Sequence, residues 1–149
     1  MVKILMVCLG NICRSPLAEG ILKSKVNNNE ILVDSAGTAS YHVGELPDER
    51  SIQVAQINNI DLTNQRCRQI TISDFDEFDH IYVMDSSNFN DVLSLARNEQ
   101  DKQKVRRILD LIHPDKNLDV PDPYYGGERG FDRVFNLLDK ACDEIVKNL

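Results

Sequence analysis

The feature that most constrains how this chain can fold is a short apolar run at residues 4–7 that leads through Cys8 into a helix-like segment at residues 16–25. A short continuous apolar run is typical of a buried strand, whereas the apolar residues of the following segment have helical spacing. A strand-to-helix turn points successive backbone N–H groups into one concavity, where a phosphate-sized anion can bind. We therefore predict an anion-binding loop at residues 8–15, at the carboxyl end of the first strand.

The residues of this loop fit a phosphate site that carries a reactive thiol. Cys8 would lie at its base, where a helix N-terminus and a nearby cation favour the thiolate. Arg14 would bind two oxygens of the anion through its planar guanidinium. Gly10 and Asn11 both tolerate positive φ angles, and Pro16 suits a first helical turn. The alternative is that the cysteines here are small buried hydrophobes in an ordinary turn.

The composition indicates one domain that covers residues 1–149. The chain has 149 residues, of which 42% are hydrophobic and 28% charged, as is ordinary for a globular protein with a single core. Its net charge of −7 and its lack of a basic run argue against nucleic acid or an anionic membrane as a partner. The longest apolar stretch is too short to span a bilayer, and the first residues lead straight into a strand, with no room for a signal peptide.

The cysteines and histidines predict neither disulfides nor a metal site. Four cysteines without the spacing of a disulfide framework suit a reducing compartment, so we expect a cytoplasmic protein. They also lack the paired CxxC spacing of a zinc site, and the three histidines, His42, His80 and His113, form no metal-like cluster in the sequence. We expect no metal and no cofactor.

Apolar segments alternate with helical patterns along the chain. We expect strands at residues 2–7, 31–34, 80–84 and 105–111, helices at residues 16–25, 47–57, 86–97 and 131–148, and a short helical turn from Ser73. Ser86 or Ser87 is the expected cap of the helix at 86–97, and residues 99–104 are expected to be a solvated helix end. This alternation implies an α/β fold with a four-stranded parallel sheet and helices on both faces. In such sheets the site lies beyond the carboxyl ends of the strands, where the predicted anion loop falls.

A second unusual segment lies at residues 120–127, where two prolines stiffen the backbone around Asp122. A carboxylic acid near the strand ends can protonate a departing alkoxide or phenoxide and then activate water. The adjacent Tyr124 and Tyr125 could form walls that stack on an aromatic leaving group. The alternative is a Pro-Asp-Pro turn with two tyrosines at its rim.

Other positions keep two interpretations each. Ser35 could form a hydrogen bond with the anion loop or be a plain turn serine, and Tyr41 could be an exposed wall or part of half-buried loop packing. Cys67 and Cys142 are interpreted as core or surface thiols rather than functional ones.

Two motifs together resemble those of a known family. Residues 7–19 read VCLGNICRSPLAE and residues 122–126 read DPYYG, and both are similar to segments of the low-molecular-weight protein tyrosine phosphatases. Residues 34–38, 68–71 and 84–88 are also similar, so the resemblance spans essentially the whole chain. It implies the flavodoxin-like phosphotyrosine phosphatase I fold. It also implies a metal-free hydrolysis of phosphotyrosine in proteins through a phosphocysteine intermediate.

The resemblance further implies a role for each matching residue. Cys8 would be the nucleophile, Arg14 would bind the phosphate and the transition state, and Asp122 would be the general acid. The other residues around the phosphate would be Leu9, Gly10, Asn11, Ile12, Cys13 and Ser15. The Ser15 hydroxyl would bond to the thiolate. Loop support would come from Asn11 and Ser35, and the substrate slot would be lined by Tyr41, Tyr124 and Tyr125. The partner would be a phosphotyrosine-containing protein, either a tyrosine kinase or the substrate of one.

One position departs from the family pattern, and one has a second expected role. Many animal members have a histidine, bonded to the loop asparagine, where this chain has Gln65. Glutamine can donate the same hydrogen bond, so we expect a modest effect on the loop. Cys13 is close enough in sequence to Cys8 for a disulfide to form after oxidation, although disulfide geometry could forbid it. We therefore expect a redox-sensitive enzyme.

Three rival functions are open for a chain with this loop. Thioredoxin-coupled arsenate reductases are similar at Cys-x5-Arg but need two further cysteines close together, whereas Cys67 and Cys142 are 75 positions apart. Bacterial phosphoarginine phosphatases also resemble the chain but carry threonine where it has Ile12. A non-catalytic phosphate-binding or redox-sensing module would not need an intact nucleophile, arginine and acid.

Overall fold

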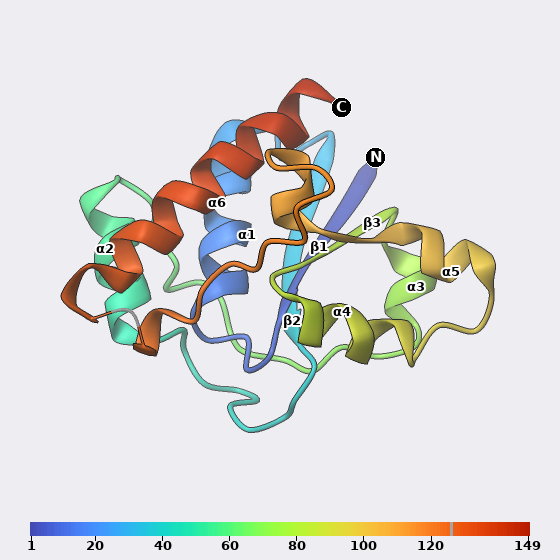
Figure 1. Cartoon of the computed structure of the whole chain (residues 1–149). Coiled ribbons are helices and arrows are strands. Elements are labelled where there is room, and N and C mark those ends of the chain that lie inside the picture. Colours follow the sequence, from blue (N-terminus) through green and yellow to red (C-terminus); the bar gives the residue numbers. More distant parts are fainter. Residues whose placement is uncertain (126) are drawn as a thin grey trace.

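The computed structural model describes residues 1–125 and 127–149, without the side chains of Tyr125 and Glu128. A four-stranded parallel sheet in the order β2-β1-β3-β4 forms its centre. The strands are β1 (Val2–Cys8), β2 (Ile31–Gly37), β3 (His80–Val83) and β4 (Val105–Arg107). Because β1 is the first strand of the chain and a central one in the sheet, its carboxyl end lies between those of β2 and β3 (Figure 1).

Helices cover both faces of this sheet, as the sequence predicts (Figure 1). One face carries α1 (Arg14–Lys25), α2 (Glu49–Ile57) and α6 (Gly130–Lys147), and the other carries α3 (Asp74–Glu77), α4 (Ser86–Leu93) and α5 (Glu99–Lys104). Short 3-10 turns complete the described chain at η1 (Ile108–Leu111), η2 (Pro123–Tyr125) and η3 (Gly127–Arg129). None of the helices within the described ranges is long and apolar enough to cross a bilayer.

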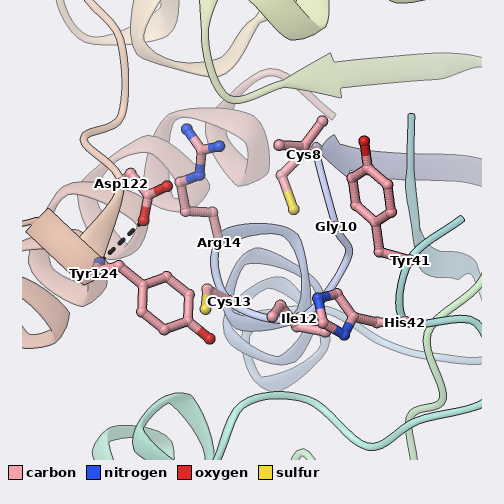
Figure 2. Close-up of a pocket in the computed structure, with 10 residues that line it drawn as sticks. Cys8, Gly10, Ile12, Cys13, Arg14, Tyr41, His42, Asp122 and Tyr124 are labelled. Atoms are coloured by element: carbon pink, nitrogen blue, oxygen red, sulfur yellow. Dashed lines mark hydrogen bonds between the residues drawn. The ribbon is translucent and has the colours of Figure 1, made fainter. Parts of the chain in front are cut away.

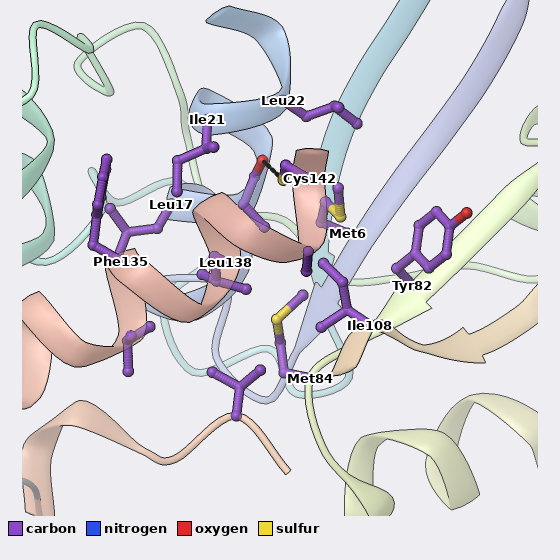
Figure 3. Packing of buried hydrophobic residues seen from close by; sticks show 14 of the residues in the cluster. Met6, Leu17, Ile21, Leu22, Tyr82, Met84, Ile108, Phe135, Leu138 and Cys142 are labelled. Carbon is purple, nitrogen blue, oxygen red and sulfur yellow. Dashed lines mark hydrogen bonds between the residues drawn. The ribbon is translucent and has the colours of Figure 1, made fainter. Parts of the chain in front are cut away.

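The apolar run of β1 is continuous because both of its faces are buried. Ile4, Met6 and Cys8 belong to the core cluster beneath α1 and α6, whereas Leu5 and Val7 belong to the cluster on the opposite face. Successive side chains of a strand point to opposite faces, so this division follows from the strand itself. Figure 3 shows the larger cluster, where side chains of α1 and α6 pack over the sheet. Cys8 is the last residue of the buried strand, so its side chain has a fixed direction.

The structure corrects four of the expected elements. The strand expected at 31–34 extends to Gly37, so Ser35 lies in β2 and not in a turn. Only residues 105–107 of the expected fourth strand pair with β3, and the chain continues as η1. The helix expected at 86–97 ends at Leu93, and its N-cap is Asp85 rather than a serine. Residues 99–104 are not a helix end but a separate helix, capped by Asn98.

Candidate active site

The turn between β1 and α1 wraps tightly around the end of the sheet. Asn11 has a φ of 58°, as the sequence allows, whereas Gly10 does not have a positive φ. Gly37, at the end of β2, lies against this turn: a Cβ at that position would be 2.6 Å from the carbonyl oxygen of Leu9. A larger residue there would therefore push the turn away from the sheet.

Cys8 is buried at the base of the turn and its sulfur has two polar neighbours. The Ser15 Oγ lies 3.0 Å from Cys8 Sγ, and the backbone N–H of Asn11 donates to the same sulfur at 3.3 Å. The start of α1 is also the end of this turn. The sulfur is therefore held at the base of the turn by a side chain and a backbone group from the turn itself.

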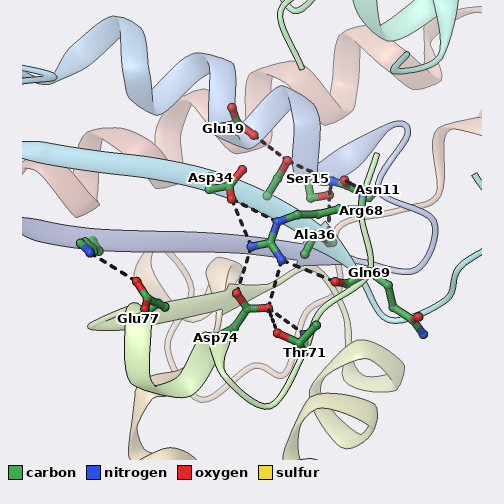
Figure 4. Close-up of polar contacts among 12 residues, drawn as sticks. Asn11, Ser15, Glu19, Asp34, Ala36, Arg68, Gln69, Thr71, Asp74 and Glu77 are labelled. Atoms are coloured by element: carbon green, nitrogen blue, oxygen red, sulfur yellow. Dashed lines mark hydrogen bonds and ion pairs between the residues drawn. The ribbon is translucent and has the colours of Figure 1, made fainter. Parts of the chain in front are cut away.

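The Asn11 side chain connects the turn to the rest of the protein (Figure 4). Its Nδ2 donates to Ser15 Oγ at 2.8 Å and to Ser35 Oγ at 2.9 Å, and its Oδ1 accepts the backbone N–H of Arg68 at 2.9 Å. The Arg68 guanidinium in turn bonds to Asp34 and Asp74. The turn is thus fixed by buried side-chain hydrogen bonds.

Glu19 extends this network, although no role was predicted for it from the sequence. Ser35 Oγ donates to Glu19 Oε1 at 2.6 Å, and Lys23 Nζ lies 2.6 Å from Glu19 Oε2. Burial raises the pKa of the Glu19 carboxyl, while the hydrogen bonds from Lys23 and Ser35 oppose this rise. Ser35 therefore has two partners, a buried carboxyl on α1 and the amide of Asn11.

Gln65 does not make the hydrogen bond that its sequence position suggests. Its Nε2 donates to the carbonyl oxygen of Pro16 at 3.0 Å, and its Oε1 has no partner among the described residues. The Asn11 Oδ1 instead accepts from the Arg68 backbone. The loop asparagine is therefore held without Gln65, because a backbone group from the neighbouring segment takes the available position.

Arg14 is held in place by a residue that the sequence did not identify. The side chain is only 8% exposed, and its Nη1 donates to Asp85 Oδ2 at 2.8 Å and to the carbonyl oxygen of Val120 at 3.0 Å. Asp85 also accepts the backbone N–H of Asn88 through its other oxygen, as the cap of α4. The described hydrogen bonds of the Arg14 guanidinium all use Nη1. Its Nε and Nη2 remain available for two oxygens of an anion.

Most of the predicted site residues line one cavity of about 140 Å³, whereas Asn11, Ser15 and Ser35 lie outside its lining. Its lining consists of Cys8, Leu9, Gly10, Ile12, Cys13, Arg14, Tyr41, His42, Asp122 and Tyr124. Figure 2 shows Cys8 and Arg14 between the rings of Tyr41 and Tyr124, with Asp122 beside Arg14. Tyr41 is 76% exposed and Tyr124 is 45% exposed, so both lie at the mouth. His42 is an additional lining residue that the sequence did not single out, and the Tyr125 side chain lies outside the described residues.

Side chains at the start of α2 contact the segment with Asp122 through Tyr124. Asp122 Oδ1 accepts the backbone N–H of Tyr124 at 3.0 Å. The Tyr124 hydroxyl donates to Asp48, the N-cap of α2, and the guanidinium of Arg50 lies 4.5 Å from the centre of the Tyr124 ring. Arg50 also lies 4.7 Å from the ring of Phe131. Burial and the hydrogen bond to Asp48 both raise the pKa of Tyr124, so this hydroxyl remains a donor.

The other cysteines differ in their relation to the cavity. Cys13 lines it, and burial together with the charge of Asp48 raises the pKa of its thiol to about 12. Cys67 Sγ donates to the carbonyl oxygen of Asn11 at 2.9 Å, and burial raises its pKa to about 11. Cys142 is in the core beneath α1. In the part of the chain that the structure describes, no group of three or more His, Cys, Asp or Glu side chains could hold a metal ion.

Comparison with known proteins gives full-length matches. The family profile described as low molecular weight phosphotyrosine protein phosphatase matches residues 3–149. The low molecular weight protein-tyrosine-phosphatase YfkJ of Bacillus subtilis is 35% identical, over 100% of this chain and 96% of the relative. A crystal structure of a protein tyrosine phosphatase from Entamoeba histolytica, with Hepes in its active site, has a TM-score of 0.90 and 41% identity, over 99% of this chain and 96% of its own. The crystal structure of a drosophila arginine phosphatase has a TM-score of 0.89 and 31% identity, over 99% of this chain and 97% of its own.

Proposed function

The chain belongs to the low molecular weight phosphotyrosine protein phosphatase family, and from this premise we propose that it hydrolyses phosphotyrosine in proteins by a two-step reaction through Cys8. One observation carries this proposal. The Cys8 thiol lies at the base of a cavity that Arg14 and Asp122 also line, so a nucleophile, an anion-binding group and a proton donor surround one volume. These are the groups that phosphoryl transfer to a thiolate requires.

In the first step the Cys8 thiolate attacks phosphorus and the bond from phosphorus to the phenolic oxygen breaks. Arg14 and the backbone amides of the loop bind the non-bridging oxygens and stabilise the charge that develops on them. Asp122, in its protonated form, gives its proton to the departing phenolic oxygen. The products of this step are tyrosine and a phosphocysteine on Cys8.

In the second step water attacks the phosphocysteine and the sulfur leaves as a thiolate. Asp122 is now a carboxylate and accepts a proton from the attacking water. The Ser15 hydroxyl and the Asn11 N–H stabilise the departing thiolate, which is supported by their distances of 3.0 and 3.3 Å from the sulfur. Inorganic phosphate leaves, and the enzyme returns to its initial state.

Selectivity for phosphotyrosine follows from the depth and the lining of the cavity. Cys8 is buried, whereas Tyr41 and Tyr124 lie at the mouth, so a substrate must reach past two aromatic rings. A phosphotyrosine side chain is long enough to do so and offers a flat ring to stack on them. Ile12 adds an apolar contact that disfavours a charged guanidinium.

The experiment that tests this proposal compares turnover of one peptide carrying phosphotyrosine, phosphoserine or phosphoarginine, with arsenate reduction measured alongside. We expect phosphotyrosine to have the highest kcat/KM and arsenate reduction to be absent. Ile12→Thr should gain phosphoarginine activity and lose phosphotyrosine activity. A wild-type preference for phosphoarginine would overturn the proposal, and unchanged ratios in the variant would remove Ile12 from the argument.

Reversible oxidation is a second part of the proposal. Peroxide would convert the Cys8 thiolate to a sulfenic acid, and the Cys13 thiolate would then displace hydroxide to form a Cys8–Cys13 disulfide. This is supported by the position of Cys13 in the lining of the same cavity. Since its pKa is raised to about 12, the disulfide should form faster as the pH rises from 7 to 9. Dithiothreitol should restore activity in the wild type and much less in Cys13→Ser. Absence of the disulfide in mass spectra, with equal recovery, would make Cys13 merely structural.

A further inference from the structure

A second cavity, of about 320 Å³, lies directly beside the catalytic one. Leu9, Arg14 and Asp122 line both cavities, so the two are continuous around these residues. The rest of its lining comes from the start of α4 and from the segment before Asp122. It has four polar or acidic residues, Asp85, Ser87, Asn88 and Asp119, and two apolar ones, Val120 and Pro121. We call this second space the side cavity.

The carboxylates of the side cavity are not equivalent. Asp85 is occupied by the guanidinium of Arg14 and by the backbone N–H of Asn88. Asp122 carries a proton when it acts as the general acid. Asp119 is exposed, and its described hydrogen bonds, from the backbone N–H and the Oγ of Ser86, both reach Oδ1. Its Oδ2 is therefore the carboxylate oxygen that can accept from a ligand.

Asn88 gives an independent indication that a ligand with hydrogen-bonding groups belongs here. The residue is 1% exposed and lines the side cavity, yet its Oδ1 accepts no hydrogen bond from any described residue. A buried amide oxygen without a donor is costly and uncommon in folded proteins. A ligand that brings N–H donors into the side cavity would satisfy it.

We propose that the side cavity binds the ammonium or guanidinium group of a lysine or arginine that lies near the phosphotyrosine in the substrate. This inference rests on the proposed function, because it places the phosphotyrosine in the catalytic cavity. The cation would pair with Asp119 and donate to Asn88, while the adjacent substrate backbone would cross Leu9, which is 46% exposed between the two spaces. Arg14 does not repel this cation strongly, since Asp85 and the bound phosphate balance its charge.

A third cavity, on the other flank of the catalytic one, provides a matched control. It also includes Leu9 and Tyr41, and Asp91 of α4 contributes a carboxylate to it. Asp91 and Asp119 are both exposed aspartates beside the catalytic cavity, and they line different spaces. A preference that depends on Asp119 and not on Asp91 therefore locates the basic residue.

The experiment measures kcat/KM for phosphotyrosine peptides that carry lysine, alanine or glutamate at each of the positions from two before to two after the phosphotyrosine. We expect one position at which lysine exceeds alanine by about two- to fivefold, the range of an exposed ion pair, with the preference weakening at high salt. Asp119→Asn should bring this ratio close to one, Asp119→Lys should favour glutamate, and Asp91→Asn should retain the wild-type ratio.

Three results would overturn the inference: no preference for lysine at any position, a preference that survives in Asp119→Asn, or one that disappears in Asp91→Asn. Each ratio compares two peptides on the same variant, so the folded fraction of a variant cancels. Hydrolysis of the alanine peptide by the wild type separately tests the proposed function. A failure of that function is thereby distinguished from a failure of the side cavity.

Discussion

The two sides of the catalytic cavity are built in different ways. The turn from the end of β1 to the start of α1 has buried side chains at Cys8, Asn11, Arg14 and Ser15, and each of them has hydrogen-bond partners within the described chain. The segment around Asp122 has buried Val120 and Pro123 on either side, but the contacts next to the acid are those of the exposed Tyr124 and Arg50. The anion-binding side is thus fixed before the substrate arrives, whereas the proton-donating side depends on contacts that cost little to change.

This difference separates two kinds of catalytic contribution. A preorganised set of donors stabilises transition-state charge without having to reorganise during the reaction. A general acid needs only a proton at the right distance, and its contribution is correspondingly smaller. Substitutions on the two sides should therefore differ both in size and in the step that they affect.

The largest effect is expected for Cys8→Ser, which should lower kcat by at least about 10⁴-fold, because a serine hydroxyl is far less ionised and a poorer leaving group. If the loop is preorganised by its backbone and by Arg14, the variant should still bind vanadate or phosphate, as measured by calorimetry. Arg14→Lys is the matched variant: it should lose much of the anion affinity, since a point charge replaces a bidentate group. Loss of anion binding in Cys8→Ser would contradict a preformed loop.

The next effect is that of Asp122→Asn on the other side of the cavity. It should slow hydrolysis of aryl phosphates by roughly 10²–10⁴-fold when the leaving group is a weakly acidic phenol. Strongly acidic phenols leave without a proton, so they should be affected less. The measurement is kcat across a series of leaving groups, and an equal loss along the whole series would assign Asp122 to binding or folding instead.

Much of the fold could be predicted from the sequence because local patterns determine it. The buried run of β1 and the amphipathic pattern of α6 both lie where periodicity places them. The end of β4 could not be predicted, because an apolar segment is compatible with both a strand and a 3-10 turn. The partner strand β3 is only four residues long, and this limits how far β4 can pair. The break after Leu93 and the Asn98 cap were also missed, because the helical pattern runs through them.

The candidate site also has residues that could be predicted from the sequence and residues that could not. Cys8, Arg14 and Asp122 could be selected because they lie in unusual local motifs, and the structure brings them to one cavity. Asp85 and Glu19 were assigned no role, since their partners are distant in the sequence: Arg14 is 71 residues from Asp85, and Ser35 is 16 from Glu19. Tertiary partners of this kind leave no trace in local spacing. The same limit explains why Gln65 was expected to bond near the loop asparagine and does not.

The Ser35→Ala variant tests how much the hydrogen bonds of Ser35 support the turn between β1 and α1. It would leave the buried Glu19 Oε1 without its donor and remove one partner of Asn11 Nδ2. We expect a loss of about 1–3 kcal/mol in the free energy of unfolding at pH 7, the cost of leaving buried polar groups unpaired. Activity should fall by about tenfold or less, because Ser15 still holds Asn11.

The pH dependence of this variant has a defined sign. Burial raises the pKa of Glu19 in the folded protein, so the stability linked to its proton is fully present below its unfolded pKa and is lost as the pH rises through the folded pKa. Ser35→Ala removes a hydrogen bond to the charged form. The difference from the wild type in urea unfolding should therefore be larger at pH 7 than at pH 4. Ser24→Ala, which removes a hydroxyl bonded to Ile21, is the control and should show no such dependence. A difference that is constant with pH would remove Glu19 from the network.

The smallest effect is expected at Arg50, which acts on Asp122 only through Tyr124. Arg50→Met keeps an unbranched side chain over the rings of Tyr124 and Phe131 but removes the cation, so the segment with the acid should be held less firmly. We expect kcat for weakly acidic phenols to fall by about threefold, and kcat for strongly acidic ones to stay unchanged, because only proton transfer depends on this position.

Arg66→Met is the control, at an exposed arginine bonded to Thr63 and Gln65, and it should change kcat for neither class of phenol. In an Asp122→Asn background Arg50→Met should cause no further loss, since there is no acid left to position. Additive losses in the double variant would mean that Arg50 acts on the substrate directly, and the two sides of the cavity would then be less distinct than their contacts indicate.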